Sequence, residues 1–243
     1  TEISDTALVA AIKAAQRMFC LLDDATLRST FIAELNRSVQ YRAQQLALSI
    51  NYYRWLRCLP ADQQVIVVNI PAAEMNVYLH DSVVLHMRMV VGKSSTPTPT
   101  FSSIADQVIL YPYWHVPNKI AVNELLPAIK RNPAYLDQGG YQLMDKSGRI
   151  VNPYAVNWRK INRRNFPYLI RQSTGCDNAL GLIKVNFYSP FGVYLHDTPT
   201  KISFSLNKRY FSHGCMRMEK PMELGRRLLD GNTIAIDTLE QKG

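Results

Sequence analysis

The residues best suited to covalent chemistry lie near the C-terminal end of the sequence. Cys215 follows Gly214 in the segment Ser-His-Gly-Cys-Met-Arg, with His213 two residues before it, and His196 stands upstream in Tyr-Leu-His-Asp. A free thiol has a pKa near ~8.5, so it needs a nearby imidazole to become a nucleophile at neutral pH. Glycine permits a tight turn that aims backbone N–H groups at an oxyanion. From these residues alone, Cys215 is either a reactive thiol or a small buried side chain.

The other cysteines favour no competing chemistry. Cys20, Cys58 and Cys176 are widely spaced in the sequence. They are too few for a disulfide framework, and no Cys-x-x-Cys pair indicates zinc. We therefore expect neither a metal nor a cofactor.

The net charge of +9 favours binding to an anionic partner, for which nucleic acid, lipid headgroups and cell-wall polymers are the options. Basic residues cluster at Arg159, Lys160, Arg163, Arg164 and Arg171. The same cluster also fits a solvated positive face. Because no RNA- or DNA-binding motif accompanies it, we expect no nucleic-acid partner.

No stretch of the sequence approaches the ~20 apolar residues that span a bilayer. The sequence begins at Thr1 without the basic and apolar regions of a signal peptide. We take the chain to be processed or trimmed, so this feature does not indicate the cytoplasm.

Helical periodicity predicts three helices before Leu56, the first capped by Ser4 or Asp5 and the last closed by Pro60. The apolar positions that define them are Leu8, Ile12, Ala15 and Phe19, then Leu27, Phe31 and Leu35, then Val39, Ala43, Leu46, Ile50 and Tyr53.

From Val65 onward the period changes to two, which is typical of strands. We predict strands over 65–70, 75–79, 85–91, 168–171, 181–187, 193–195 and 233–237, with a hairpin turn at 80–82 and a loop over 93–100. Short helices are expected over 122–130 and from Pro221 through Leu224, Leu228 and Leu229. The predicted fold class is α+β, a mainly β, sandwich-like catalytic region preceded by helices.

The segment around Cys215 resembles the signature of L,D-transpeptidases with the YkuD-type catalytic domain. That signature has a histidine, a spacer and then Ser/Thr-His-Gly-Cys; here the spacer between His196 and Ser212 is residues 197–211. Arg217 fits the version that ends in arginine.

The resemblance extends over residues 64–238 and is similar to the large, periplasmic, YcbB-like branch. It is carried by Val-Asn-Ile-Pro at 68–71, Val-Gly-Lys at 91–93, Thr-Pro-Thr-Pro at 96–99, Pro-Tyr-Trp-His-Val-Pro at 112–117, Asn-Ala-Leu-Gly at 178–181 and Tyr-Leu-His-Asp-Thr-Pro at 194–199. Residues 1–60 form a separate helical region, in which 6–37 resemble either a peptidoglycan-binding module or a generic bundle. Cys176 stands where this branch tends to carry proline, and the ending soon after Asp237 suggests a short or trimmed C-terminus.

The resemblance implies a role for each motif residue. Cys215 would be the nucleophile, His196 its general base, and His213 a group that positions and polarises the site. Backbone N–H groups around residues 213–215 would form the oxyanion hole, beside Ser212 and Gly214. Asp197 or a nearby carbonyl would orient the imidazole, and Arg217 would bind a substrate carboxylate, brace the site or form a surface salt bridge.

The implied activity is peptidoglycan cross-linking outside the cytoplasm, in the periplasm. Cys215 would attack the carbonyl of diaminopimelate in one stem peptide, D-Ala would leave, and an amine of a second stem would resolve the thioester. The implied partners are donor and acceptor stem peptides and other cell-wall enzymes, and carbapenems would acylate the cysteine. Alternatives are an L,D-carboxypeptidase, an enzyme that attaches protein to the wall, and a non-catalytic wall-binding module.

Residues 118–165 are predicted to be an inserted lid over the site, with a rigid structural subdomain as the alternative. Leu125, Leu126, Ile129 and Tyr135 would form its apolar underside, Gly139 and Gly140 its hinge, and Arg149, Arg159, Arg163 and Arg164 its contacts to stem carboxylates. We expect His80 and His86 at the surface and Trp55, Trp114 and Trp158 in packing roles, while His115 lies either at the surface or in the cleft.

Overall fold

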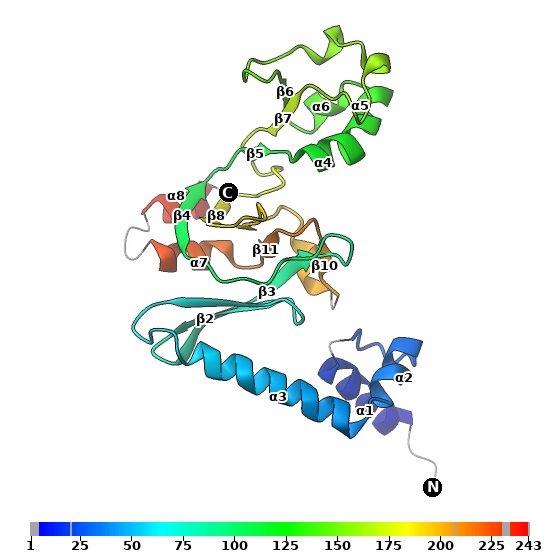
Figure 1. The fold of residues 1–243 in the computed structure, drawn as a ribbon, viewed down its shortest axis with the longest axis vertical. Coiled ribbons are helices and arrows are strands. Elements are labelled where there is room, and N and C mark those ends of the chain that lie inside the picture. The colour runs from blue at the N-terminus through cyan, green and yellow to red at the C-terminus, as the bar shows by residue number, and fades with distance from the viewer. Residues whose placement is uncertain (1–4, 20, 207, 230–233, 243) are drawn as a thin grey trace. The chain divides into compact units, whose positions relative to one another are not determined.

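The computed structural model describes residues 5–19, 21–206, 208–229 and 234–242 (Figure 1). The chain divides into two compact units. The first comprises Thr1–Pro97 and Ile202–His213, and the second comprises Thr98–Lys201 and Gly214–Gly243. The short helix η4 (Lys201–Ser205) crosses the boundary between the two units in the sequence. Its first residue, Lys201, is assigned to the second unit and the rest of the helix to the first.

Three helices open the first unit, as the periodicity predicts: α1 (Asp5–Met18), α2 (Ser29–Leu35) and α3 (Val39–Leu56). Ser38 caps α3, since its hydroxyl accepts a hydrogen bond from the Tyr41 N–H. The proposed cap Ser4 lies outside the described residues. No residue of α3 is buried, and Trp55 is exposed, so the expected packing role for this tryptophan is wrong.

The β part of the first unit is an antiparallel meander with one parallel addition. β1 (Val65–Asn69) pairs with β2 (Glu74–Leu79), β2 pairs with β3 (Ser82–Gly92), and β10 (Tyr210–Ser212) runs parallel to β3. His80 and Asp81 both have positive φ, 49° and 59°, which is the geometry of a tight two-residue hairpin. The predicted turn is therefore confirmed, and Met75, Val77, Met87 and Met89 fill the core face of the meander.

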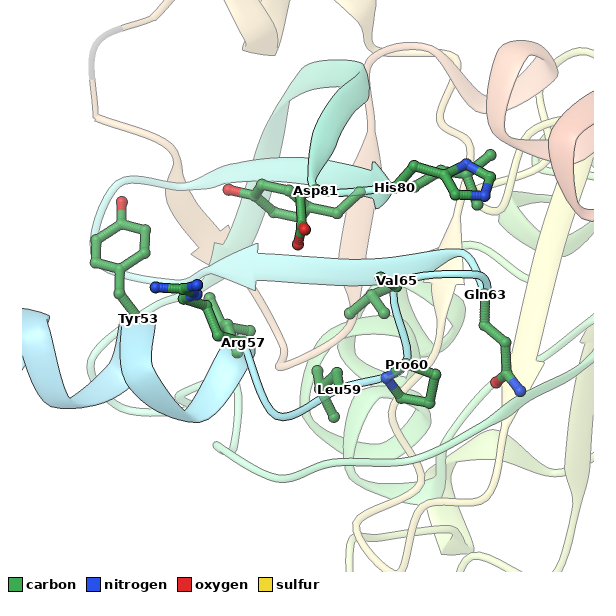
Figure 2. Close-up of a pocket in the computed structure, with 12 residues that line it drawn as sticks. Tyr53, Arg57, Leu59, Pro60, Gln63, Val65, His80 and Asp81 are labelled. Atoms are coloured by element: carbon green, nitrogen blue, oxygen red, sulfur yellow. The ribbon is translucent and has the colours of Figure 1, made fainter.

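A pocket of about 330 Å³ lies where the end of α3 meets β1 and the β2–β3 hairpin (Figure 2). Tyr53, Arg57, Val65, His80 and Asp81 are among its lining residues. None of the lining residues belongs to the predicted site. The pocket is a feature of the first unit alone.

The second unit contains a four-stranded mixed sheet in the order β11 (Met216–Met218), β9 (Leu195–His196), β8 (Ile183–Phe187) and β4 (Ala105–Leu110). β9 pairs parallel to β11 and antiparallel to β8. Ile183, Val185, Leu195 and Met218 are buried in its core. The expected α+β class with a mixed, mainly β catalytic region is confirmed.

Two helices follow the sheet, α7 (Pro221–Leu228) and α8 (Ile234–Lys242). The prediction of a strand over 233–237 is wrong, because residues 234–237 are helical, while residue 233 lies outside the described residues. Ile236 is fully buried against α7, where a Cβ added to Gly225 would lie 2.7 Å from its Cδ1. Arg226 also donates a hydrogen bond to Asp237 at 3.0 Å. These contacts override the strand preference of a β-branched run.

A second, smaller sheet in this unit has the order β5 (Trp114–His115), β7 (Leu169–Gln172), β6 (Tyr141–Met144), with helices beside it (Figure 1). The helical run is α4 (Asn118–Ile120), the π-helix η1 (Ala121–Leu125) and α5 (Leu126–Arg131), followed by α6 (Tyr135–Gln138) and the 3₁₀ turns η2 (Pro153–Ala155) and η3 (Trp158–Lys160). We call residues 114–172 the cap subdomain.

The cap subdomain has its own hydrophobic core. Leu125, Leu126 and Ile129 are buried in it together with Trp158 and Ile170, so they form this core rather than the predicted apolar underside of a lid. α6 ends just before Gly139 and Gly140, the two residues predicted to form a hinge, and hydrogen bonds hold their backbone to the end of β7. The Gln172 side chain and the Ser173 N–H donate hydrogen bonds to these two carbonyls.

Candidate active site

Three neighbouring strands of the second unit place three basic side chains in one row. His196 on β9 pairs with Lys184 on β8 and with Arg217 on β11. Directly paired residues project from the same face of a sheet, so the imidazole has a cation on each side. We call Lys184, His196 and Arg217 the cationic row.

His196 is buried, with 5% of its surface exposed, and its Nδ1 lies 2.5 Å from the Asp197 carbonyl oxygen. A carbonyl can only accept, so Nδ1 carries the proton and Nε2 keeps its lone pair. Burial lowers the pKa of His196 to about 3, with a further contribution from Arg217 and a smaller one from Lys184. The imidazole is therefore neutral and has the tautomer that a general base needs.

Asp197 contributes its carbonyl to this arrangement, while its carboxylate is used elsewhere. One carboxylate oxygen accepts the Leu182 N–H at 2.9 Å, and the other forms an ion pair with Lys201. Gly181 has a φ of +59°, and a Cβ at this position would lie 2.3 Å from the Asp197 carboxylate. Glycine at 181 is what allows the carboxylate to approach this backbone.

Cys215 directly precedes β11, after Gly214, whose φ of 113° lies in the region that favours glycine. The Gly214 carbonyl accepts a hydrogen bond from the Thr98 hydroxyl at 2.8 Å. Burial raises the pKa of the Cys215 thiol, while hydrogen bonds from Tyr194 and the charges of Lys184 and Arg217 act in the opposite direction. Burial dominates, so the thiol is protonated at neutral pH.

Tyr194 connects these groups, although the sequence motif did not single it out as a site residue. Its side chain forms a hydrogen bond with Cys215 and accepts a hydrogen bond from the Trp114 indole. Its ring lies edge to face with the His196 ring, with 5.6 Å between the ring centroids. The ammonium of Lys184 stands over its ring, 4.1 Å from the centroid. Burial raises the pKa of Tyr194, so the hydroxyl remains protonated.

Arg217 reaches the site from the other side of His196. Its Nε is buried and has no hydrogen-bond partner in the described part of the chain. Burial lowers the pKa of this guanidinium, and the charge of Cys215 opposes the shift. The arginine thus has a donor available for an anionic group, rather than the surface salt bridge that was the alternative.

The other predicted residues belong to the first unit, at the end of β10. Ser212 is buried, and its carbonyl accepts hydrogen bonds from the Lys93 N–H and the Thr96 hydroxyl. His213 is exposed, as are His80, His86 and His115. Cys58 and Cys176 are free and exposed, and Cys20 lies outside the described residues.

Among the described residues, no group of three or more His, Cys, Asp or Glu side chains is arranged to hold a metal ion. None of the helices in the same residues combines the length and hydrophobicity that a membrane span requires.

The family description of the YkuD L,D-transpeptidase catalytic domain matches residues 63–236. The chain therefore belongs to the L,D-transpeptidase catalytic-domain family. A Haemophilus influenzae protein named "Putative L,D-transpeptidase" is 37% identical over 182 residues, which make up 75% of this chain and 37% of that relative. The chain thus corresponds to well under half the length of this curated relative.

Solved structures of the same class are more distant. An L,D-transpeptidase from Mycobacterium smegmatis is 16% identical, covers 67% of this chain and 52% of its own, and has a TM-score of 0.36. L,D-transpeptidase 3 from Mycobacterium tuberculosis is 14% identical, covers 65% and 53%, and has a TM-score of 0.35. Assignment to the YcbB-like branch stays a prediction.

Proposed function

We propose that this chain is the catalytic domain of an extracytoplasmic L,D-transpeptidase that joins diaminopimelate residues of two peptidoglycan stems. The observation that carries the proposal is that one side chain, Tyr194, contacts both the buried, neutral ring of His196 and the thiol of Cys215. A neutral imidazole with a free Nε2 can take the thiol proton.

The first half-reaction forms a thioester. Nε2 of His196 accepts the Cys215 proton as the sulfur attacks the carbonyl carbon of the third stem residue, and the carbonyl becomes an oxyanion. Backbone N–H groups around Gly214 and the buried guanidinium of Arg217 stabilise that negative charge. The imidazolium then protonates the leaving D-Ala amine as the carbon–nitrogen bond breaks.

In the second half-reaction, the side-chain amine of another stem attacks the thioester. His196 removes a proton from this amine, and the thiolate leaves and is reprotonated. Water is the competing acceptor, which makes exclusion of water the feature that separates transfer from hydrolysis. We propose that the cap subdomain provides this exclusion, with the indole of Trp114 holding Tyr194 from its first strand.

Purified disaccharide tetrapeptide tests the assignment. We expect release of D-Ala and a cross-linked dimer in mass spectra, a protein adduct of one acyl group on Cys215, and loss of all three in Cys215→Ala. Cys176→Ser removes an exposed cysteine and is the matched control that should keep them. Dimer formation by Cys215→Ala contradicts the proposal, and a disaccharide tripeptide as sole product indicates an L,D-carboxypeptidase instead.

The covering role of the cap subdomain has its own test. Hydrogen exchange across residues 118–165 should slow when a carbapenem acylates Cys215. Unchanged exchange would favour the alternative, a rigid subdomain that does not respond to the donor.

A further inference from the structure

Lys184 is a cation that the sequence motif does not account for. It lies on β8, directly opposite His196, and its ammonium stands 4.1 Å from the centroid of the Tyr194 ring. It is half-buried, and it is close enough to Cys215 for their charges to interact. The position is therefore inside the site rather than at a solvated edge.

No carboxylate neutralises this lysine in the described part of the chain. The salt bridges found there include neither Lys184 nor Arg217. The acid nearest in sequence to His196 is Asp197, whose carboxylate is held by Lys201 and the Leu182 N–H. A partly desolvated ammonium held on an aromatic face, without an acidic partner, suits an anionic ligand.

Building on the proposed function, we propose that Lys184 is a specificity-determining residue that binds the free carboxylate of the residue leaving from the donor stem. In a tetrapeptide donor this carboxylate belongs to the D-Ala that follows the scissile bond. Its carbon is separated from the attacked carbonyl by one peptide nitrogen and one Cα. A group beside Cys215 and His196 is thus within reach of it.

The carboxylate would also change the chemistry of the row. With donor absent, two cations flank His196 and oppose a positive charge on it. A carboxylate next to Lys184 offsets one of them, so the imidazolium costs less free energy once the negative charge has moved from the sulfur to the attacked carbonyl of a donor with a free carboxylate. The preference for a donor with a free terminal carboxylate should therefore appear in kcat as well as in KM.

The competing role for Lys184 is stabilisation of the Cys215 thiolate, which would help every donor equally. Two donors separate the roles: disaccharide tetrapeptide with its terminal carboxylate, and the same compound as the terminal amide. For the wild-type protein we expect kcat/KM about 10- to 100-fold higher on the acid, the range of one lost hydrogen bond to a charged group.

Lys184→Met should bring the ratio of kcat/KM on the acid donor to kcat/KM on the amide donor close to one. Lys184→Arg should keep most of that ratio. Lys146→Met, at an exposed lysine of the cap subdomain, removes the same charge and should leave the ratio unchanged. Alkylation of Cys215 by iodoacetamide reports the thiol alone. A Lys184→Met protein that loses activity equally on both donors, with slower alkylation, overturns the proposal.

The wild-type measurement is decisive even if a variant does not fold. Equal kcat/KM on acid and amide in the wild-type protein refutes the role of Lys184. If neither donor is turned over while Cys215 still reacts with iodoacetamide, the proposed function fails instead.

Discussion

Replacement of His196 by asparagine should make the stability of the protein less sensitive to acid. The Asn side-chain amide can still donate to the Asp197 carbonyl from about the position of Nδ1, but it cannot bind a proton. In the wild-type protein the pKa of His196 falls from its ordinary 6.5 to about 3 on folding. Between these two values the unfolded chain binds a proton that the folded chain does not, so stability falls as pH falls.

The magnitude follows from the two pKa values. A pH of about 4.5 is two units below the unfolded value and still above the folded one, so the wild-type protein loses on the order of 2–3 kcal/mol of stability relative to neutral pH through this group. His196→Asn lacks this loss. The cavity left by the substitution costs a similar amount of stability at every pH, so the difference in unfolding free energy between the two proteins should narrow by about 2–3 kcal/mol on acidification.

Urea unfolding at neutral pH and at a pH of about 4.5, followed by circular dichroism, measures the difference in unfolding free energy between the wild-type protein and His196→Asn. Comparing the two proteins cancels the titration of carboxylates that both share. His115→Asn, at an exposed position on β5, is the matched control for removal of one histidine. A gap of the same size at both pH values would refute the argument, since it would mean that the folded imidazole binds protons as readily as the unfolded one.

Two further predictions concern Gly181 and the thiol. Gly181→Ala should lower the free energy of unfolding by about 2–4 kcal/mol and slow acylation, because positive φ and a clash with Asp197 act together. Gly192→Ala has a similar φ of +65° and open space around its Cβ, so the difference between the two in urea unfolding isolates the clash; equal effects would contradict it. Iodoacetamide should alkylate Cys215 slowly at neutral pH, and the rate should rise only above the ordinary pH range for thiols, because burial raises the pKa of Cys215. Tyr194→Phe should move this rise to still higher pH, because it removes a hydrogen bond that lowers the pKa of the thiol. A rate that is already maximal at pH 7 would show that the resting thiol is ionised.

Local sequence patterns predicted the elements whose stability is local. The 3.6-residue period located α1, α2 and α3, and the two-residue period with His80 and Asp81 located the β2–β3 hairpin. The same reasoning failed at residues 234–237, where Ile236 packs on α7 and the tertiary contact decides the conformation. It also could not tell that α3 leaves its apolar stripe uncovered by the described residues.

The candidate site likewise contains residues that the sequence predicted and residues that only tertiary contacts reveal. His196 and Cys215 stand in a motif of fixed spacing, so the sequence could nominate them. Lys184 and Tyr194 became visible only through the register of β8 against β9 and through ring contacts. A lysine twelve positions before the histidine carries no signal in the chain, because strand register depends on pairing that a single sequence does not reveal.

The cationic row has opposite electrostatic effects on Cys215 and His196. Lys184 and Arg217 lower the energy of a thiolate on Cys215 and of an oxyanion, but they raise the energy of an imidazolium on His196. A resting thiolate–imidazolium pair is therefore disfavoured twice, by burial of the sulfur and by the cations beside the ring. Proton transfer becomes favourable only when the negative charge leaves the sulfur for the attacked carbonyl. The site is consequently suited to a nucleophile generated during attack on a bound acyl donor, and it protects the free thiol from side reactions in its absence.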